Sequence, residues 1–342
     1  MPTTPTNLSR CTAMKACLVG FLALTMIPNL LLAQPSHEKR LLLIDQLVQE
    51  TGMDRASIAA VIKHAVYDES IITRMKTPYE SRSYAEYRPL FVHPKLALKG
   101  HDYLQKHHAV FIASEKKYGI QQEIIAAILG IETRYGTYRG KDAVVSSLYT
   151  LATGYPRRAN FFRKELGELL LLCQEEGLNP VQFKGSYAGA FGTTQFIPSS
   201  FRAYAVDANH DGKRDVWDSP EDIINSVANY FSKHGWDGSR PIAQWLPKAI
   251  QNKQIIKHAK QGFKHWVKLR DVRALLPQLD ARWQDDDKVT LIEMTTKKGK
   301  QIALIHYNFY VITRWNRSYN YAMAITELAE LMDCQLCQTH VE

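Results

Sequence analysis

Ile124-Ile-Ala-Ala-Ile-Leu-Gly-Ile-Glu132-Thr-Arg-Tyr-Gly136 places one acidic residue at the end of an apolar run. Apolar residues lie three, four and seven positions before Glu132, so a helix would present them on the same face as the carboxylate. Burial on that face disfavours the ionised carboxylate, and the acid could then donate a proton near neutral pH. A structural ion pair with a residue such as Arg134 is the alternative, and spacing alone does not decide between them.

A loop rich in small residues follows, Lys184-Gly-Ser186-Tyr-Ala-Gly-Ala-Phe-Gly-Thr-Thr-Gln195-Phe-Ile-Pro-Ser199. Its glycines permit a close approach of the backbone to a ligand. Ser186 and Gln195 offer neutral hydrogen-bonding groups of the kind that bind sugars. The Gly-Lys-Ser/Thr ending of a phosphate loop is absent, and Ser186 is not in a Gly-x-Ser-x-Gly elbow. A tight turn packed between helices is the alternative interpretation.

The segment from Asp207 to Asp218 has the spacing of a calcium-binding loop. Oxygen-bearing side chains occupy positions 1, 3 and 5, glycine occupies position 6, and an acid occupies position 12. Position 12 is Asp218, which is shorter than the usual Glu, so the loop either closes there or runs on to Glu221. For Glu221 and Asp222, a helix N-terminal charge is the alternative role. We predict a structural Ca²⁺ site formed by Asp207, Asn209, Asp211, Lys213 and Glu221.

The composition is that of a folded, basic protein. Of the 342 residues, 45% are hydrophobic and 23% are charged, so the chain has enough apolar surface to form a core. A mean hydropathy of −0.28 excludes a protein with many membrane spans. The net charge of +9 favours polyanionic partners such as acidic wall polymers, nucleic acid or anionic membranes. We expect no nucleic-acid partner, because no motif for RNA or DNA is present.

The first 33 residues have the pattern of an export signal. A basic start without acids is followed by the apolar run 16–27 and by a small residue, Ala33, before Gln34. Pro28 interrupts the run short of the ~20 apolar residues that a membrane span needs, although an anchor is the alternative. We therefore predict a cleavable signal, a periplasmic protein and no stable membrane insertion. A lipid anchor would need Cys where Gln34 stands.

Hydrophobic periodicity predicts a mainly α protein of the α+β class with a small β element. The segment 79–94 reads as an ordered but irregular connection, and 250–276 as mostly helical. Ser219, with Pro and an acid after it, predicts the start of another helix. A hairpin is expected from 289–294 and 301–305 around a Lys-Gly-Lys turn, with 307–313 as a further strand. Further helices are expected within 37–120 and at 123–135, 161–173 and 318–332.

These elements predict a signal peptide and four regions. Cys334 and Cys337 near the end predict a local disulfide or idle thiols, because a structural zinc site needs four ligands. The expected regions are a signal peptide at 1–33, an N-terminal helical region at 34–115, a catalytic core at 116–240 with the cation loop at 207–221, a small α/β region at 241–308, and a C-terminal segment at 309–342 that returns to the core.

Several motifs occur in a fixed order along the chain, and as a set they resemble a known family. They are Glu132-Thr-Arg-Tyr-Gly136, Tyr155-Pro-Arg-Arg-Ala159, Gly185-Ser-Tyr-Ala-Gly-Ala190, Gln195-Phe-Ile-Pro-Ser-Ser200, Trp217-Asp-Ser-Pro-Glu-Asp222, Asn225-Ser-Val-Ala-Asn-Tyr-Phe231 and Thr313-Arg-Trp-Asn-Arg-Ser-Tyr319. The set resembles the membrane-bound lytic transglycosylase B family of peptidoglycan-cleaving enzymes, and the resemblance extends roughly over residues 87–323. It implies a lysozyme-like helical catalytic core. Some members of that family carry a lipid anchor, and this sequence is similar to the soluble ones.

The resemblance also implies the chemistry. Glu132 would be the sole catalytic acid and base, and it would protonate the bond oxygen between N-acetylmuramic acid and N-acetylglucosamine. The muramic acid C6 hydroxyl would then close on C1 and give a 1,6-anhydro sugar. This internal nucleophile removes the need for a second carboxylate. The expected partner is the glycan strand, the expected state is a monomer, and no cofactor is expected for catalysis. The alternatives are a lysozyme-type muramidase and an idle wall-binding protein.

The family's binding positions map onto eight residues of this sequence. Ser186 and Gln195 would bond the substrate or Glu132, and the two arginines would face lactyl carboxylates or peptide stems. Trp315 stands where the family commonly has Tyr, so stacking is kept while a phenol hydrogen bond is in question. A core role is the alternative for Tyr230 and an ion pair for Arg157. The predicted substrate-binding set is Tyr87, Arg157, Arg158, Ser186, Gln195, Tyr230, Asn316 and Tyr321.

Overall fold

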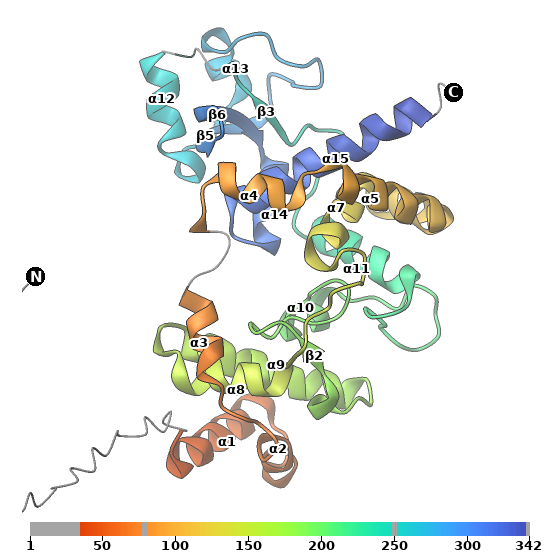
Figure 1. Ribbon diagram of the computed structural model, residues 1–342, viewed down its shortest axis with the longest axis vertical. Coiled ribbons are helices and arrows are strands. Elements are labelled where there is room, and N and C mark those ends of the chain that lie inside the picture. Colours follow the sequence, from red (N-terminus) through yellow and green to blue (C-terminus); the bar gives the residue numbers. More distant parts are fainter. Residues whose placement is uncertain (1–34, 77–80, 248–249, 251, 340–342) are drawn as a thin grey trace, which may run out of the picture. The chain divides into compact units, whose positions relative to one another are not determined.

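The computed structural model describes residues 35–76, 81–247, 250 and 252–339, with side chains described up to 333 (Figure 1). The chain from Pro35 to Glu342 forms one compact unit. Within the described residues, no helix combines the length and the apolar character that crossing a membrane requires. The predicted signal peptide lies outside the described residues, as do the side chains of Cys334 and Cys337.

Helices make up most of the described chain, which confirms the predicted fold class. The first are α1 (His37–Thr51), α2 (Arg55–Ile62) and α3 (Glu69–Lys76), and they pack against α8 (Val144–Gly154) and α9 (Ala159–Glu175). Figure 1 shows these five helices grouped together. Next along the chain come α4 (Tyr84–Phe91), α5 (Pro94–Lys106) and α6 (His108–Tyr118).

The expectation of an irregular connection at 79–94 is wrong for most of its described part. Residues Tyr84–Phe91 form α4, which begins with a capping box in which Ser83 and Glu86 satisfy each other's backbone N–H groups. Pro89 lies inside this helix. The aromatic residues that suggested irregular chain are instead buried on the inner face, where Tyr84 and Tyr87 are 2% and 1% exposed. Burial of this face outweighs the local cost of the proline.

Helix α7 (Gln122–Thr133) lies in the middle of the fold and contacts α5, α11 (Pro220–Lys233) and α15 (Tyr319–Thr339). Every residue from Ile124 to Gly130 is buried, so the helix is apolar on all sides, as a central helix must be. Helix α11 starts as predicted, because the Ser219 hydroxyl accepts a hydrogen bond from the Asp222 N–H. The short α10 (Pro198–Tyr204) packs on α9 and α11.

The predicted hairpin is confirmed and belongs to a four-stranded antiparallel sheet with the order β3-β6-β5-β4. Strands β5 (Lys288–Thr296) and β6 (Gly299–His306) pair through the register Thr296 to Gly299, which leaves a two-residue turn at 297–298. Strands β3 (Ala243–Trp245) and β4 (Val267–Lys268) flank them. This region has an apolar core of its own, which includes Leu246, Leu269, Trp283 and Leu291.

The described residues of 250–276 are mostly helical, as expected, but the helices are short: α12 (Lys253–Ala259), α13 (Leu269–Val272) and two 3₁₀ turns, interrupted by β4. Another expectation for this region is wrong. Residues 307–313 form helix α14 (Tyr307–Trp315) instead of a strand. The His306 ring accepts a hydrogen bond from the Asn308 N–H and so caps α14, while Phe309 and Ile312 are buried at helical spacing.

Candidate functional site

Glu132 lies in the last turn of α7, and an unusual turn fixes this helix end. The residues that follow, Arg134, Tyr135 and Gly136, have φ values of 50°, 59° and 80°, all in the left-handed region. Two consecutive non-glycine residues in that region are costly and persist only where the surroundings require them. The Thr133 hydroxyl donates to the Thr193 carbonyl at 3.0 Å and accepts from the Gly136 N–H at 2.9 Å. These hydrogen bonds link the turn after Glu132 to the loop rich in small residues at 184–199.

Two aromatic donors converge on the same oxygen of Glu132. The Tyr321 hydroxyl donates to Oε1 at 2.7 Å, and the Trp315 indole N–H donates to Oε1 at 3.0 Å. Tyr321 comes from the start of α15 and Trp315 from the end of α14, so the loop between these helices delivers both donors. Among the described residues no ion pair joins Arg134 to Glu132, and the Arg134 guanidinium lies over the Tyr138 ring. The ion pair with Arg134 that the sequence allowed is therefore not supported.

The indole of Trp315 is held by a group of aromatic rings. It stacks on Phe231 at 5.7 Å between centroids and meets Tyr230 edge to face at 4.8 Å, and Phe196 lies 5.1 Å away. Tyr230 is only 6% exposed and also stacks on His234, so it supports Trp315 from the core. For Tyr230 the structure thus favours the core role over direct contact with a ligand.

The loop rich in small residues is built by backbone contacts. Its first strand, β2 (Lys184–Gly185), pairs with β1 (Asp142–Ala143). A Cβ on Gly185 would lie 2.1 Å from the Ala190 carbonyl, so this close approach requires glycine. The Ser186 hydroxyl accepts from the Ala190 N–H at 3.1 Å. Gln195 has a φ of 52°, and its amide donates to the Arg139 and Gly192 carbonyls. Both predicted polar residues therefore bond to the chain's own backbone, and neither bonds to Glu132.

The predicted arginines are exposed and close to a third cation. Arg157 and Arg158 end a 3₁₀ turn (Pro156–Arg158), and the Arg158 guanidinium lies over the Phe161 ring at 4.2 Å. Burial and then the nearby charge of Arg317 lower the pKa of Arg158. Within the described part of the chain Arg157 has no ion-pair partner, so the ion-pair alternative is not supported.

The two remaining predicted residues flank the same region from different elements. Tyr87 is on α4, buried to 1% exposure, and packs against Phe91. Asn316 caps the C-terminus of α14 and is half-buried, directly after Trp315. Of the eight predicted binding residues, Tyr321, which is 2% exposed, is the one whose hydrogen bond to Glu132 the described residues show.

The predicted cation loop bonds mainly to itself. Asp207 accepts from the N–H groups of Asp211 and Gly212, and Asp211 accepts from the N–H of Lys213. Asn209 accepts from the Asp211 N–H. Among the described residues, no three His, Cys, Asp or Glu side chains gather as a metal-binding group, so Glu221 does not join Asp207 and Asp211 as a third acid.

Two acids near this loop have other partners. Asp218 pairs with Arg139 at 2.9 Å, which argues against Asp218 as the residue that closes the loop. Buried Asp222 accepts from the N–H groups of Ala208 and Asp215 and so clamps the two ends of the loop. Helix N-terminal charge, considered for Asp222 from the sequence, is only part of its role.

Sequence reasoning missed three contributions to the site. The indole bond from Trp315 to Glu132 spans 183 positions and has no local signal. Arg317 joins the arginines only through the fold, although its place in the Trp-Asn-Arg motif could have drawn attention to it. The Asp222 clamp was hidden because an acid in the first turn of a helix usually needs no further explanation.

Known proteins are similar to this chain in sequence and in fold. The family model described as Transglycosylase SLT domain matches residues 36–330. The membrane-bound lytic murein transglycosylase B of Escherichia coli strain K12 is 34% identical over 299 residues, covering 84% of this chain and 80% of that protein. The catenated lytic transglycosylase SltB1 from Pseudomonas aeruginosa has a TM-score of 0.80 and 37% identity, covering 88% of this chain and 98% of that one.

A second solved structure bears on the cation loop. The Escherichia coli lytic transglycosylase SLT35 in complex with calcium has a TM-score of 0.75 and 31% identity, and the match covers 89% of this chain and 99% of that one. The matches span the helical core, the turn after Glu132 and the small sheet together. The chain therefore belongs to the lytic transglycosylase family of peptidoglycan-cleaving enzymes.

Proposed function

We propose that this protein cleaves the bond between N-acetylmuramic acid and N-acetylglucosamine and releases 1,6-anhydro products, with Glu132 as its single acid and base. The observation that carries this proposal is the pair of donors on one oxygen of Glu132. A carboxyl group held in this way can protonate the bond oxygen and then take the proton of the C6 hydroxyl as that hydroxyl closes on C1. No second carboxylate is needed, because the nucleophile belongs to the substrate.

The masses of the products test this chemistry. Purified sacculi digested with the protein should yield muropeptides that are each lighter by one water than the products of a muramidase. Products with a free reducing end would instead show that water attacks C1. Binding to sacculi without soluble products would identify an idle wall-binding protein. Either of these two outcomes rejects the lytic mechanism.

The charges of the exposed arginines support a role for them in holding the substrate. Arg157 and Arg158, with Arg317 beside them, present guanidinium groups that suit lactyl carboxylates or peptide carboxylates. The aromatic rings that pack against Trp315 hold its indole in place, and we propose that a sugar ring stacks on this indole. We further propose a monomer that acts on glycan strands in the periplasm after removal of residues 1–33.

We also propose that the loop at 207–221 binds Ca²⁺ for stability. Asp207, Asn209 and Asp211 bring side-chain oxygens to one tight turn around Gly212, whose φ is 88°, and such oxygens are the ligands that Ca²⁺ prefers. Lys213 and Glu221 complete the proposed set, and Glu221 would have to turn toward the loop. The calcium complex of SLT35 supports this assignment.

Calcium should therefore raise the melting temperature. At a free concentration a hundred times the Kd, binding stabilises the folded state by about 2.7 kcal/mol, which corresponds to a shift of several degrees. Scanning calorimetry with Ca²⁺ and with EDTA would measure the shift, and an Asp211→Ala variant should abolish it. Asp45→Ala, which removes an exposed acid on α1, is the matched control. An equal melting temperature with Ca²⁺ and with EDTA contradicts a stabilising site.

A further inference from the structure

Helix α15 presents a second face that the proposed chemistry does not use. Tyr321 points to Glu132, whereas Met323, Glu327 and Glu330 follow at spacings of two, six and nine residues. A two-residue step turns a helix by about 200°, so Met323 and the glutamates at helical spacing from it lie on another side. Two adjoining hollows lie along this side, and Trp245 and Glu327 line both of them. We call this pair of hollows the rear groove.

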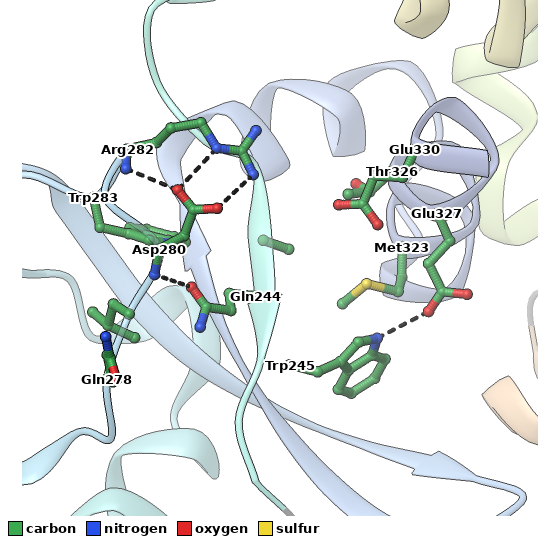
Figure 2. Close-up of a pocket in the computed structure, with 12 residues that line it drawn as sticks. Gln244, Trp245, Gln278, Asp280, Arg282, Trp283, Met323, Thr326, Glu327 and Glu330 are labelled. Atoms are coloured by element: carbon green, nitrogen blue, oxygen red, sulfur yellow. Dashed lines mark hydrogen bonds and ion pairs between the residues drawn. The ribbon is translucent and has the colours of Figure 1, made fainter. Parts of the chain in front are cut away.

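The first hollow has a volume of about 520 Å³ and lies between α15 and the loop at 278–283. Figure 2 shows Arg282 and Asp280 bonded to each other on one wall, and Glu330, Glu327 and Trp245 on the other. Glu327 is already engaged, because it accepts from the Trp245 indole at 2.9 Å and pairs with Arg88. Glu330 forms no ion pair within 4 Å in the described part of the chain. Burial and then the charge of Glu327 raise the pKa of Glu330, while Arg282 across the hollow lowers it. An ammonium group bound here would stabilise the ionised carboxylate.

The second hollow has a volume of about 420 Å³ and lies between α4 and the tip of the β5–β6 hairpin. Lys297 and Lys298 form that tip, and neither has an ion-pair partner among the described residues. Tyr84 lines the floor and is 2% exposed. Burial, then the charge of the neighbouring Glu327 carboxylate and a hydrogen bond to it, raise the pKa of Tyr84. The groups of this hollow that are left for a ligand are therefore the two lysines.

We propose that the rear groove binds a short zwitterionic peptide, its carboxylate at Lys297 and Lys298, and its ammonium group at Glu330. The two lysines line the second hollow and Glu330 lines the first, so a ligand that carries both a negative and a positive charge could meet both hollows. The indole of Trp245 lies between the two hollows, where it offers an apolar surface to the middle of the peptide.

The peptide stems of peptidoglycan have this chemistry, because their ends carry a free carboxylate and a diamino residue carries a free side-chain amine, while the amino terminus is joined to the lactyl group. A stem bound in the rear groove would attach the protein to the polymer at a second point, in addition to the glycan bound at Glu132. Tethering at two points raises the effective concentration of substrate without any new contact at the reacting bond. The inference rests on the family's action on peptidoglycan and does not depend on which molecule attacks C1.

A synthetic stem pentapeptide without sugars tests the groove, because it contains no bond for the enzyme to cleave. Calorimetric titration of the full chain should show binding. Glu330→Gln and the double variant Lys297→Ala, Lys298→Ala should each weaken that binding at least about tenfold, which is the effect of roughly 1.4 kcal/mol.

The controls come from the same region and from the peptide itself. The double variant Lys257→Ala, Lys260→Ala removes two exposed lysines of the small α/β region away from the groove and should bind as the wild type does. A pentapeptide whose side-chain amine is acetylated and whose carboxyl end is amidated should bind more weakly than one with both groups free. Cleavage of a peptide-free glycan should be unchanged in all rear-groove variants.

Three results would overturn the proposal. One is the absence of binding at millimolar peptide, and another is binding that none of the rear-groove variants weakens. The third is binding that Arg157→Ala removes and Glu330→Gln does not, which would place the peptide beside Glu132. Glu132 is not part of the groove, so the titration tests peptide binding independently of the proposed catalytic role of Glu132. Failure of one proposal can therefore be told from failure of the other.

Discussion

A Glu132→Gln variant should lose activity on peptidoglycan by a factor of about 10³ or more, because proton transfer by one positioned group commonly contributes 10²–10⁴ in rate and here one group transfers a proton twice. Glutamine has the shape of glutamate, so its carbonyl oxygen can still accept from Trp315 and Tyr321. It can neither donate a proton to the bond oxygen nor take one from the C6 hydroxyl. The fold and the binding of the glycan should therefore survive while turnover stops.

Release of anhydro-muropeptides from sacculi, followed by mass spectrometry, measures this loss. Glu123→Gln is the matched control, because Glu123 lies in the first turn of the same helix and makes no contact with Trp315 or Tyr321. The control should keep its rate and its melting temperature. A Glu132→Gln protein that still released anhydro products at a tenth of the wild-type rate would contradict the assignment of Glu132.

Local signals made part of this structure predictable. The apolar spacing before Glu132 marked a buried helix that ends at an acid, and α7 ends at Thr133 with the carboxylate half-buried. Ser219 marked the start of α11 because capping is a contact between close neighbours in sequence. The hairpin was readable for the same reason, since strands of alternating pattern around a short turn pair locally.

Other features depend on contacts between distant segments, and these were missed or misjudged. Residues 307–313 are as apolar as a strand, and only the His306 cap and burial on one side make them α14. The sequence left a phenol hydrogen bond in question at Trp315, whereas the structure shows that the indole donates to Glu132 in its place. Ser186 and Gln195 carry the right groups for sugars, yet their bonds to the backbone are set by the shape of the loop.

Trp315 and Tyr321 fix which oxygen of Glu132 carries the proton. An indole N–H can only donate, so Oε1 must act as an acceptor in every protonation state. Tyr321 donates to the same oxygen, and the proton that is transferred is therefore held on Oε2. Both donors also stabilise the ionised carboxylate that forms after the first transfer. We infer that they are positioning residues whose loss alters the acid itself as well as the packing around it.

Trp315→Phe and Tyr321→Phe should each lower kcat by about tenfold to a hundredfold, because a hydrogen bond to a charged group contributes about 1.5–3 kcal/mol. Losing a donor also favours the protonated acid, so the alkaline limb of the pH–rate profile should move to higher pH in both variants. Trp236→Phe, which removes an indole bond to Gln121, and Tyr319→Phe on α15 are the matched controls. They should leave the profile unmoved. If the two variants lose activity with no shift of that limb, the aromatic residues support only the packing, and the proton on Oε2 is not under their control.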